Sequence, residues 1–378
     1  MNLRFHWMLP KAGEVLLDAQ QTPQAAASYR IQSTNVASPA SQPDKKGWLH
    51  FAKKAEEAGI DSVLISFSRF EPDPLIVSCA LGRATKKLKF ILAYRSGLIQ
   101  PTLFVQQINT LSALIEGRVA CNLVAGSSRL EQQGFGDYLP HDERYARTEE
   151  FLSVCRAFWR AEGEVTFEGK YYRVEQGKVH TPFVAPDRKA PEIYVSGHSD
   201  AAERLALTQR CCLLRVADSP DNLRCSVERM RQHGIEVCLR ACILCRPSRE
   251  EAISVAESFL SQSNVVSQCR NIGLKDDSQM HRQASDVFNG ESKRSNGCLW
   301  TGLVPYFGPV WTTLLGTPAD IAAALLEYKA IGLTQFILSG WPELDTMIDF
   351  GREVLPLVRD AEHRHEVMQC SRTTMQVD

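Results

Sequence analysis

The sequence predicts a (β/α)8 barrel, in which eight parallel strands alternate with helices. Short apolar, β-branched runs alternate with longer amphipathic runs along most of the chain. Several amphipathic runs end in Gly directly before the next strand-like run. One strand-like run ends in Asn122 and small residues, and a polar loop then leads to a helix with an acidic start near His141. In α/β proteins, ligands usually bind at such carboxyl ends of strands.

The strand-like runs are short and mostly apolar, and helical patterns lie between most of them. The predicted strands cover residues 3–9, 61–67, 88–94, 118–124, 192–196, 211–215, 236–244 and 335–339. The predicted helices cover residues 48–58, 101–115, 144–159, 199–207, 220–232, 249–260, 318–331 and 343–357.

Four glycines mark the step from a helix to the next strand: Gly59, Gly117, Gly234 and Gly332. Gly readily adopts the left-handed conformation that closes a helix at its C′ position. The repeated order of helix, Gly and strand therefore supports the barrel.

Residues 1–360 are predicted to form one domain with long insertions, followed by a polar tail over residues 361–378. The insertions lie at about residues 14–45, 160–190 and 261–317. The second carries an alternating pattern with Gly169 at its turn, which predicts a β-hairpin. Long insertions in a compact domain often form functional lids.

The composition is that of a globular protein, with 44% hydrophobic and 23% charged residues among 378. Because 43 basic residues balance 44 acidic ones, the chain lacks the basic footprint of a nucleic-acid binder. No apolar run approaches the ~20 residues of a membrane span, and the N-terminus lacks a secretory pattern. We therefore expect a cytoplasmic protein that binds neither nucleic acid nor membrane.

Twelve cysteines in a long chain without an export signal are expected to be reduced thiols that pack as small hydrophobes. Cys242 and Cys245 have C-x-x-C spacing, but they lie in a strand-like run. Residues three apart in a strand point to opposite faces, so we expect neither a redox pair nor a metal site.

Four polar features have both a functional and a structural interpretation. Asn122 could bind a planar polar ring through its amide, or end a turn. His141 could act as an acid or base, or lie on the surface at a helix start. The segment Ser196-Gly197-His198-Ser199 stands between a strand and a helix, where backbone N–H groups can bind a phosphate, although it lacks the Walker and Rossmann glycine spacings. Arg240 lies in an apolar strand and must be paired or face an anion in the lumen.

Trp7, Trp300 and Trp341 follow or end the first strand, a late insertion and the last strand. Barrel topology would place them around one cavity. Each of them could equally be a core aromatic.

The chain resembles the bacterial-luciferase superfamily over about residues 1–360, and most closely its alkanesulfonate monooxygenase branch. No single motif is decisive, but the ordered set is specific. The matching segments are Phe5-His-Trp-Met-Leu-Pro10, Leu88-Lys-Phe-Ile-Leu-Ala-Tyr-Arg95, Gln100-Pro-Thr102, Gln106-Gln107, Gly117-Arg118, Asn122-Leu-Val-Ala-Gly126, His141-Asp-Glu-Arg-Tyr145, Ser196-Gly-His-Ser-Asp200, Leu299-Trp-Thr-Gly302 and Leu338-Ser-Gly-Trp-Pro342.

The resemblance implies a luciferase-like TIM barrel with long insertions. It also implies reduced FMN delivered by a separate NAD(P)H:FMN reductase, a flavin peroxide formed with O2, and a homo-oligomer, either a dimer or a tetramer. Carried over by position, Asn122 and Ala125 would contact the flavin, and Tyr145 with residues 196–199 would hold its phosphate. His141 would lie close to the cofactor.

Several positions depart from the sulfonate enzymes. Phe70 replaces a cysteine, Cys242 a histidine, Phe307 an arginine and Trp341 a tyrosine, whereas Arg240 is retained. The other departures are Ala12 for a histidine, Val216 for a tryptophan and an additional Arg215.

A sulfonate needs fixed cationic donors to replace its hydration, so a simple alkanesulfonate is not the expected substrate. We expect His141, Arg240, Cys242 and Trp341 to be catalytic. Trp7, Phe70, Arg215, Trp300 and Phe307 are expected to line the substrate pocket.

The resemblance, taken with these departures, implies an FMNH2-dependent monooxygenase for a larger, less charged substrate, such as a biosynthetic or carrier-bound intermediate. The alternatives are a desulfonating monooxygenase, a flavin-binding protein without oxygenase turnover, and, ranked last, a deazaflavin-dependent hydride-transfer enzyme.

Overall fold

The computed structural model describes residues 2–10, 45–68, 71–126, 129–260, 297–302, 304, 309–340 and 343–374. Eight parallel strands close into a barrel, because β8 pairs with β9 and β12 pairs with β1. In order around the barrel, they are β1 (Arg4–Met8), β2 (Ser62–Ile65), β3 (Lys89–Tyr94), β4 (Val119–Val124), β7 (Glu192–Ser196), β8 (Cys212–Val216), β9 (Val237–Cys245) and β12 (Gln335–Gly340). Each overlaps one predicted strand, and the predicted (β/α)8 barrel is confirmed.

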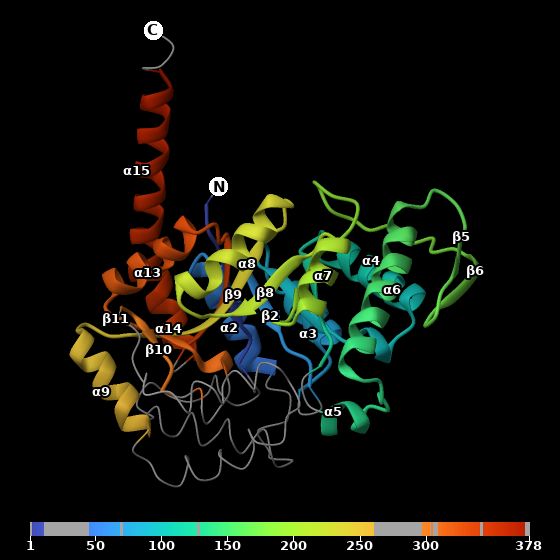
Figure 1. Cartoon of the computed structure of the whole chain (residues 1–378), viewed down its shortest axis with the longest axis horizontal. Coiled ribbons are helices and arrows are strands. Elements are labelled where there is room, and N and C mark those ends of the chain that lie inside the picture. Colours follow the sequence, from blue (N-terminus) through green and yellow to red (C-terminus); the bar gives the residue numbers. More distant parts are fainter. Residues whose placement is uncertain are drawn as a thin grey trace.

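Helices surround the barrel (Figure 1). Eight overlap the predicted ones: α2 (Lys45–Glu57), α4 (Pro101–Leu114), α6 (His141–Arg160), α7 (Asp200–Thr208), α8 (Pro220–Gln232), α9 (Arg249–Leu260), α13 (Pro318–Ala330) and α14 (Glu343–Asp349). Two further helices, α3 (Pro74–Gly82) and α5 (Arg129–Gly134), were not predicted. None of the described helices is both long and apolar enough to cross a bilayer.

After α14, one π-helical turn (Phe350–Val354) leads into α15 (Leu355–Thr374). The helix therefore continues through most of the segment expected to be a polar tail, and it projects from the body of the molecule (Figure 1).

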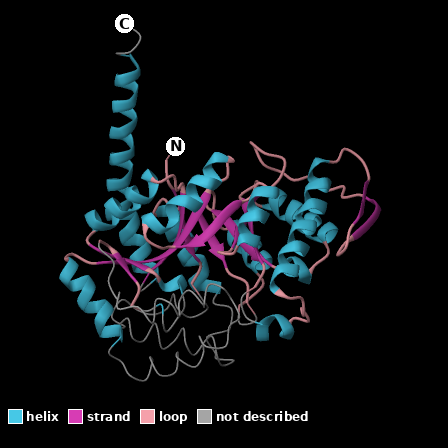
Figure 2. Ribbon diagram, viewed as in Figure 1, coloured by secondary structure: helices cyan, strands magenta, loops and turns pink. Residues whose placement is uncertain are grey.

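Two small β structures lie outside the barrel (Figure 2). The hairpin of β5 (Val165–Glu168) and β6 (Arg173–Gly177) confirms the pattern around Gly169. Strand β11 (Thr313–Gly316) pairs with the carboxyl half of β9, and β10 (Leu299–Trp300) pairs antiparallel with β11.

Strand alternation divides the core into an inner and an outer part. One cluster fills the lumen with Leu64, Ile91, Tyr194, Cys238 and Ile337, among others. A larger cluster packs the outer faces of the strands against the helices.

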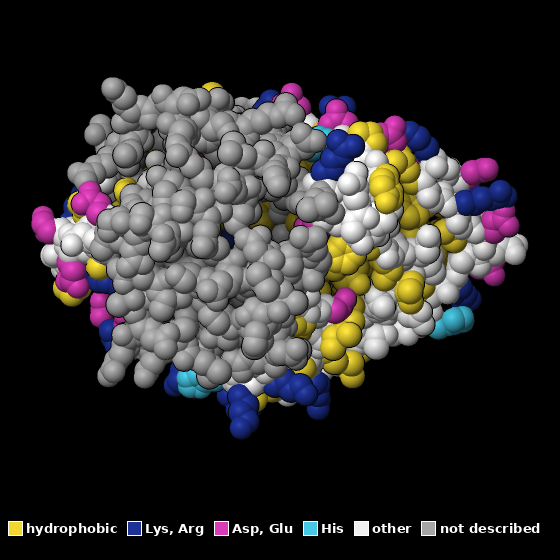
Figure 3. All heavy atoms as spheres, turned by 90° about the horizontal axis from the view of Figure 1, so that it is seen from below, with side chains coloured by type: hydrophobic (Ala, Val, Ile, Leu, Met, Phe, Trp, Pro, Cys, Tyr) yellow, Lys and Arg dark blue, Asp and Glu magenta, His cyan; other side chains and the backbone are white. Residues whose placement is uncertain are grey.

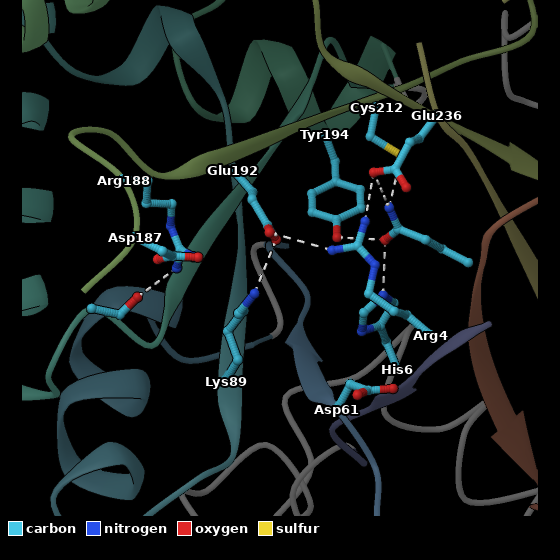
Figure 4. A network of polar contacts seen from close by, with 12 residues as sticks. Arg4, His6, Asp61, Lys89, Asp187, Arg188, Glu192, Tyr194, Cys212 and Glu236 are labelled. Carbon is cyan, nitrogen blue, oxygen red and sulfur yellow. Dashed lines mark hydrogen bonds and ion pairs between the residues drawn. The ribbon is translucent and has the colours of Figure 1, made fainter. Parts of the chain in front are cut away.

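The amino-terminal end of the barrel is closed by charged side chains (Figure 4). Arg4 lies 3.3 Å from Glu192 and 2.5 Å from Glu236, and Lys89 lies 3.1 Å from Glu192. These ion pairs join four different parts of the barrel, so a ligand has to approach from the carboxyl end.

A second layer of polar groups lies above these ion pairs. The Gln335 Oε1 atom accepts from the Tyr194 hydroxyl at 2.7 Å and lies 3.0 Å from His6 Nε2. Complete burial lowers the pKa of His6 to about 4, so its ring is neutral and donates from Nε2 at neutral pH.

Candidate active site

The carboxyl ends of β4 and β7 bring Asn122 and Ser196 together. The Ser196 hydroxyl donates to Asn122 Oδ1 at 2.8 Å, and Asn122 is buried. Among the described residues, no group accepts from Asn122 Nδ2. This nitrogen can therefore donate to a ligand at the mouth of the barrel.

The loop from Ser196 to Ser199 packs beneath Tyr145 of α6. The Tyr145 hydroxyl donates to the Ser196 carbonyl at 3.0 Å. A Cβ atom at Gly197 would lie 2.4 Å from that hydroxyl and 2.4 Å from the Cβ of Ala202. Ser199 caps α7 by accepting from Ala202 N at 3.3 Å. Glycine is thus required for this loop to lie against both α6 and α7.

His198 has a structural partner within the same loop. Its Nε2 accepts from the Val216 backbone N–H at 3.0 Å. Burial, together with nearby Arg215, lowers its pKa to about 4. The ring is therefore neutral and links the loop to β8, and at neutral pH it does not supply a positive charge to an anion.

His141 is the first residue of α6. Its Nδ1 lies 2.7 Å from Asp142 Oδ1, and its ring centroid lies 5.0 Å from that of Tyr145. The side chain is 37% exposed, so it packs on Tyr145 from the solvent side.

Arg144 also positions the site, although it was not singled out from the sequence. Its guanidinium donates to the carbonyls of Ala125 at 2.8 Å, Gly126 at 3.3 Å and Leu139 at 2.7 Å. It thereby fixes the loop that follows Asn122. The signal was present, because Arg144 belongs to the same His-Asp-Glu-Arg-Tyr motif as His141 and Tyr145.

Arg240 and Cys242 lie on the lumen side of β9. They follow the lumen residue Cys238 at every second position, and alternate residues of a strand share one face. The Cys242 Sγ lies 3.2 Å from Ser339 Oγ and 3.5 Å from the Val310 carbonyl. Cys242 packs in a cluster with Trp300, which is also buried. Three of the predicted residues are thus brought to one side of the barrel mouth.

Cys245 packs against the outer core, whereas Cys242 does not. This confirms that the C-x-x-C side chains point to opposite faces. In the part of the chain that the structure describes, no group of three or more potential metal ligands is found.

Two predicted pocket residues face away from the lumen. Trp7 is fully buried against the outer helices, and its Nε1 donates to Glu343 at 3.0 Å. Arg215 forms an ion pair with Glu203 of α7 at 2.7 Å, on the outer face of β8. Both side chains therefore point toward the surrounding helices, on the face of the strand opposite to the lumen. Phe70, Phe307 and Trp341 lie outside the described residues.

Comparison with known proteins identifies the family. A family model described as luciferase-like monooxygenase matches residues 15–335. The chain therefore belongs to the luciferase-like monooxygenase family, and the family-level resemblance is confirmed.

The fold is shared with several solved structures. EDTA monooxygenase from Chelativorans sp. BNC1 matches with a TM-score of 0.72 and 18% identity, over 96% of this chain and 94% of that one. The oxygenating constituent of 3,6-diketocamphane monooxygenase from Pseudomonas putida, a type II Baeyer–Villiger enzyme in complex with FMN, matches with 0.62 and 19%, over 94% and 98%. An F420-dependent secondary alcohol dehydrogenase also matches with 0.62 and 19%, over 95% and 99%.

Proposed function

We propose that this protein is a two-component flavin monooxygenase, which transfers one oxygen atom from O2 to an organic substrate with reduced FMN as the reductant. The proposal depends on two hydrogen bonds at the barrel mouth, from the Ser196 hydroxyl to Asn122 and from the Tyr145 hydroxyl to the Ser196 carbonyl. The close approach of Gly197 to Tyr145 makes this arrangement possible. Family membership supports the same class of reaction.

The residues of this site have the chemistry to bind FMN. The Asn122 amide nitrogen would donate to the flavin, and Ala125 would contact it from the loop fixed by Arg144. The phosphate would bind at residues 196–199 and the Tyr145 hydroxyl, where a helix begins and backbone N–H groups favour an anion. The reduced flavin supplies the reaction with O2, whereas the protein orients the ring and excludes water.

His141 would move protons between this site and solvent. Arg240, Cys242 and Trp341 would contact the substrate, and Phe70, Trp300 and Phe307 would line its pocket. Because Arg215 is held by Glu203, only one of the two arginines proposed to face the substrate lies on the lumen side.

That distribution of charge favours a large, weakly charged substrate, including a biosynthetic or carrier-bound one, over a small sulfonate. A desulfonating monooxygenase of the alkanesulfonate branch is the second candidate, supported by the lumen position of Arg240.

The proposed partners are an NAD(P)H:FMN reductase and a second copy of the chain, in the cytoplasm. Three large apolar side chains on α3 and α4 are exposed: Ile76 by 68%, Leu103 by 46% and Leu114 by 44%. Large exposed apolar side chains on neighbouring helices favour an interface there. Figure 3 shows apolar side chains gathered on part of the face drawn.

The test is an anaerobic titration with reduced and oxidised FMN, followed by rapid mixing with O2. We expect preferential binding of reduced FMN and a transient absorbance before oxidised flavin appears. Asn122→Leu should weaken binding of reduced FMN by about tenfold or more, the free energy of one or two lost hydrogen bonds. Ser196→Ala, which removes only the hydroxyl on Asn122 Oδ1, should have a smaller effect. Tight binding of oxidised FMN without a transient would instead indicate a flavin protein that is no oxygenase.

A further inference from the structure

Strand β8 holds the loop of residues 196–199 through two of its backbone groups. The Leu214 carbonyl accepts from the Gly197 N–H at 3.1 Å. Two residues further along the strand, the Val216 N–H donates to His198 Nε2 at 3.0 Å. One strand thus fixes two neighbouring residues of the loop.

The residue between these two strand positions, Arg215, holds the helix that follows the loop. Helix α7 lies next to β8 (Figure 1). The Arg215 Nη1 atom lies 2.7 Å from Oε1 of Glu203, in the first turn of α7, and the two side chains are 13% and 9% exposed. The Ser226 hydroxyl of α8 donates to the same oxygen at 2.7 Å. Separating such a pair is costly, because it would leave a nearly buried guanidinium without its carboxylate.

The Glu203 carboxylate has a second cationic partner in different surroundings. Arg229 of α8 contacts the other carboxylate oxygen, but its own side chain is 55% exposed. Exposed ion pairs contribute little, because solvent screens them and a long side chain has to be ordered. Of these two arginines, Arg215 is therefore the one that fixes the start of α7 against the barrel.

The charge of Arg215 also keeps the histidine of the loop in the form that its contact with β8 requires. Burial, and after it the Arg215 guanidinium, lower the pKa of His198 to about 4. The ring is therefore neutral, and since Nε2 accepts from Val216, Nδ1 carries the proton. Nδ1 is thus a donor, which is what a phosphate oxygen requires. Arg215 supports the loop both through α7 and through this ring.

We propose that Arg215 is a positioning residue for the flavin phosphate. It fixes the start of α7 and the ring of His198 against β8, and thereby holds the loop of residues 196–199 in the form that selects FMN over riboflavin. Because Arg215 lies on the outer face of β8, it acts through the loop and not by touching the flavin. The inference rests on the proposed function, since it concerns the phosphate end of the same site.

The first test compares the equilibrium binding of reduced FMN and reduced riboflavin, which differ only in the phosphate. In Arg215→Met, the affinity for reduced FMN should fall by about tenfold, the equivalent of one charge-assisted hydrogen bond, and that for riboflavin should stay within about twofold of wild type. In this variant, Glu203 keeps Arg229 and Ser226 as partners. Arg215→Lys, which keeps the charge but not the planar guanidinium, should give an intermediate affinity for FMN.

The matched control is Arg229→Met, because it removes the other arginine from the same carboxylate and leaves Arg215 in place. Both flavin affinities should equal those of wild type. If Arg215→Met weakens FMN and riboflavin equally, or if the control loses as much FMN affinity, the cluster only stabilises the fold and the inference is wrong. Unchanged FMN binding in Arg215→Met also overturns it.

Hydrogen exchange of the flavin-free full chain tests the positioning itself. The amides of Gly197 and Val216 form the two bonds between loop and strand, so their exchange reports directly on this contact. Both should exchange about tenfold faster in Arg215→Met and at the wild-type rate in Arg229→Met. Unchanged rates, or equally faster exchange throughout β7 and β8, would contradict the proposed role. If Arg215→Met fails to fold, Arg215→Lys provides the same comparison.

The two tests separate this inference from the proposed function. If the wild type binds neither flavin, the proposed function fails, while exchange at Gly197 and Val216 still decides whether Arg215 holds the loop. If the wild type binds both flavins equally, the phosphate does not bind at this loop. That result overturns the inference and leaves the proposed flavin contact at Asn122 standing.

Discussion

Mild acid should destabilise this protein mainly through two buried histidines, His6 in the lumen and His198 beside β8. Burial lowers both pKa values from 6.5 to about 4. The His6 ring bonds to Gln335 within the network of Figure 4, and the His198 ring accepts the Val216 N–H. Protonation of His198 would remove that acceptor, and protonation of His6 would place a charge in the lumen close to Arg4 and Lys89.

The sign and size follow from linkage between protonation and folding. Between pH 6.5 and 4, the unfolded chain binds a proton at each histidine and the folded chain does not. The contribution of the two histidines to the free energy of unfolding is therefore fully present above the unfolded pKa, and it is lost as the pH falls through this window. A difference of 2.5 pKa units corresponds to about 3 kcal/mol for each histidine. The steepest loss is about 1.4 kcal/mol per pH unit for each one.

Urea unfolding between about pH 7 and pH 5 measures this loss, because most carboxylates titrate below that window. His6→Gln and His198→Gln should each remove about half of the pH slope, and the double variant should remove most of it. His50→Gln, which changes an exposed histidine of α2, is the matched control. A His6→Gln slope equal to that of wild type would refute the reasoning for the lumen histidine.

Three further predictions concern the proposed site and interface. Gly197→Ala should weaken binding of reduced FMN by roughly tenfold or more, because its Cβ would push the Tyr145 hydroxyl aside; affinity equal to wild type in an equilibrium titration would show that the loop is not a phosphate site. Leu103→Lys, on the exposed face of α4, should lower the oligomeric mass seen by light scattering, and an unchanged mass would exclude this face as the interface. Cys242→Ser should retain single-turnover oxygenation while Cys242→Ala loses it, and full activity in both would exclude a chemical role for the thiol.

The barrel could be predicted from sequence because each strand buries both of its faces, and short apolar runs separated by helix, Gly and loop admit few other folds. Two helices escaped the same reasoning. Helix α3 is apolar on most sides, so its 3.6-residue period is hidden, although Asp73 caps it and Pro74 begins it. Helix α5 has six residues, too few for any period to be read.

The position of a side chain around a strand was harder to predict than the strand itself. Trp7 and Arg215 lie in runs where both neighbours are also buried or half-buried, so the sequence contains no polar alternation to show which face is inward. A shift of one residue turns a lumen residue into an outer one. The register that decides between them depends on β12, β2 and β9, which are distant in the chain.

The two ends of the barrel differ in how they are closed. At the amino-terminal end, Arg4, Lys89, Glu192 and Glu236 stand at or next to the starts of four strands, where each looks like an ordinary flanking charge in the sequence. Barrel closure brings them together as a network that seals the lumen. Ligands and water must then use the carboxyl end, where the Asn122 loop and α5 lie. A reaction that needs water excluded would therefore be controlled at that end, next to Asn122.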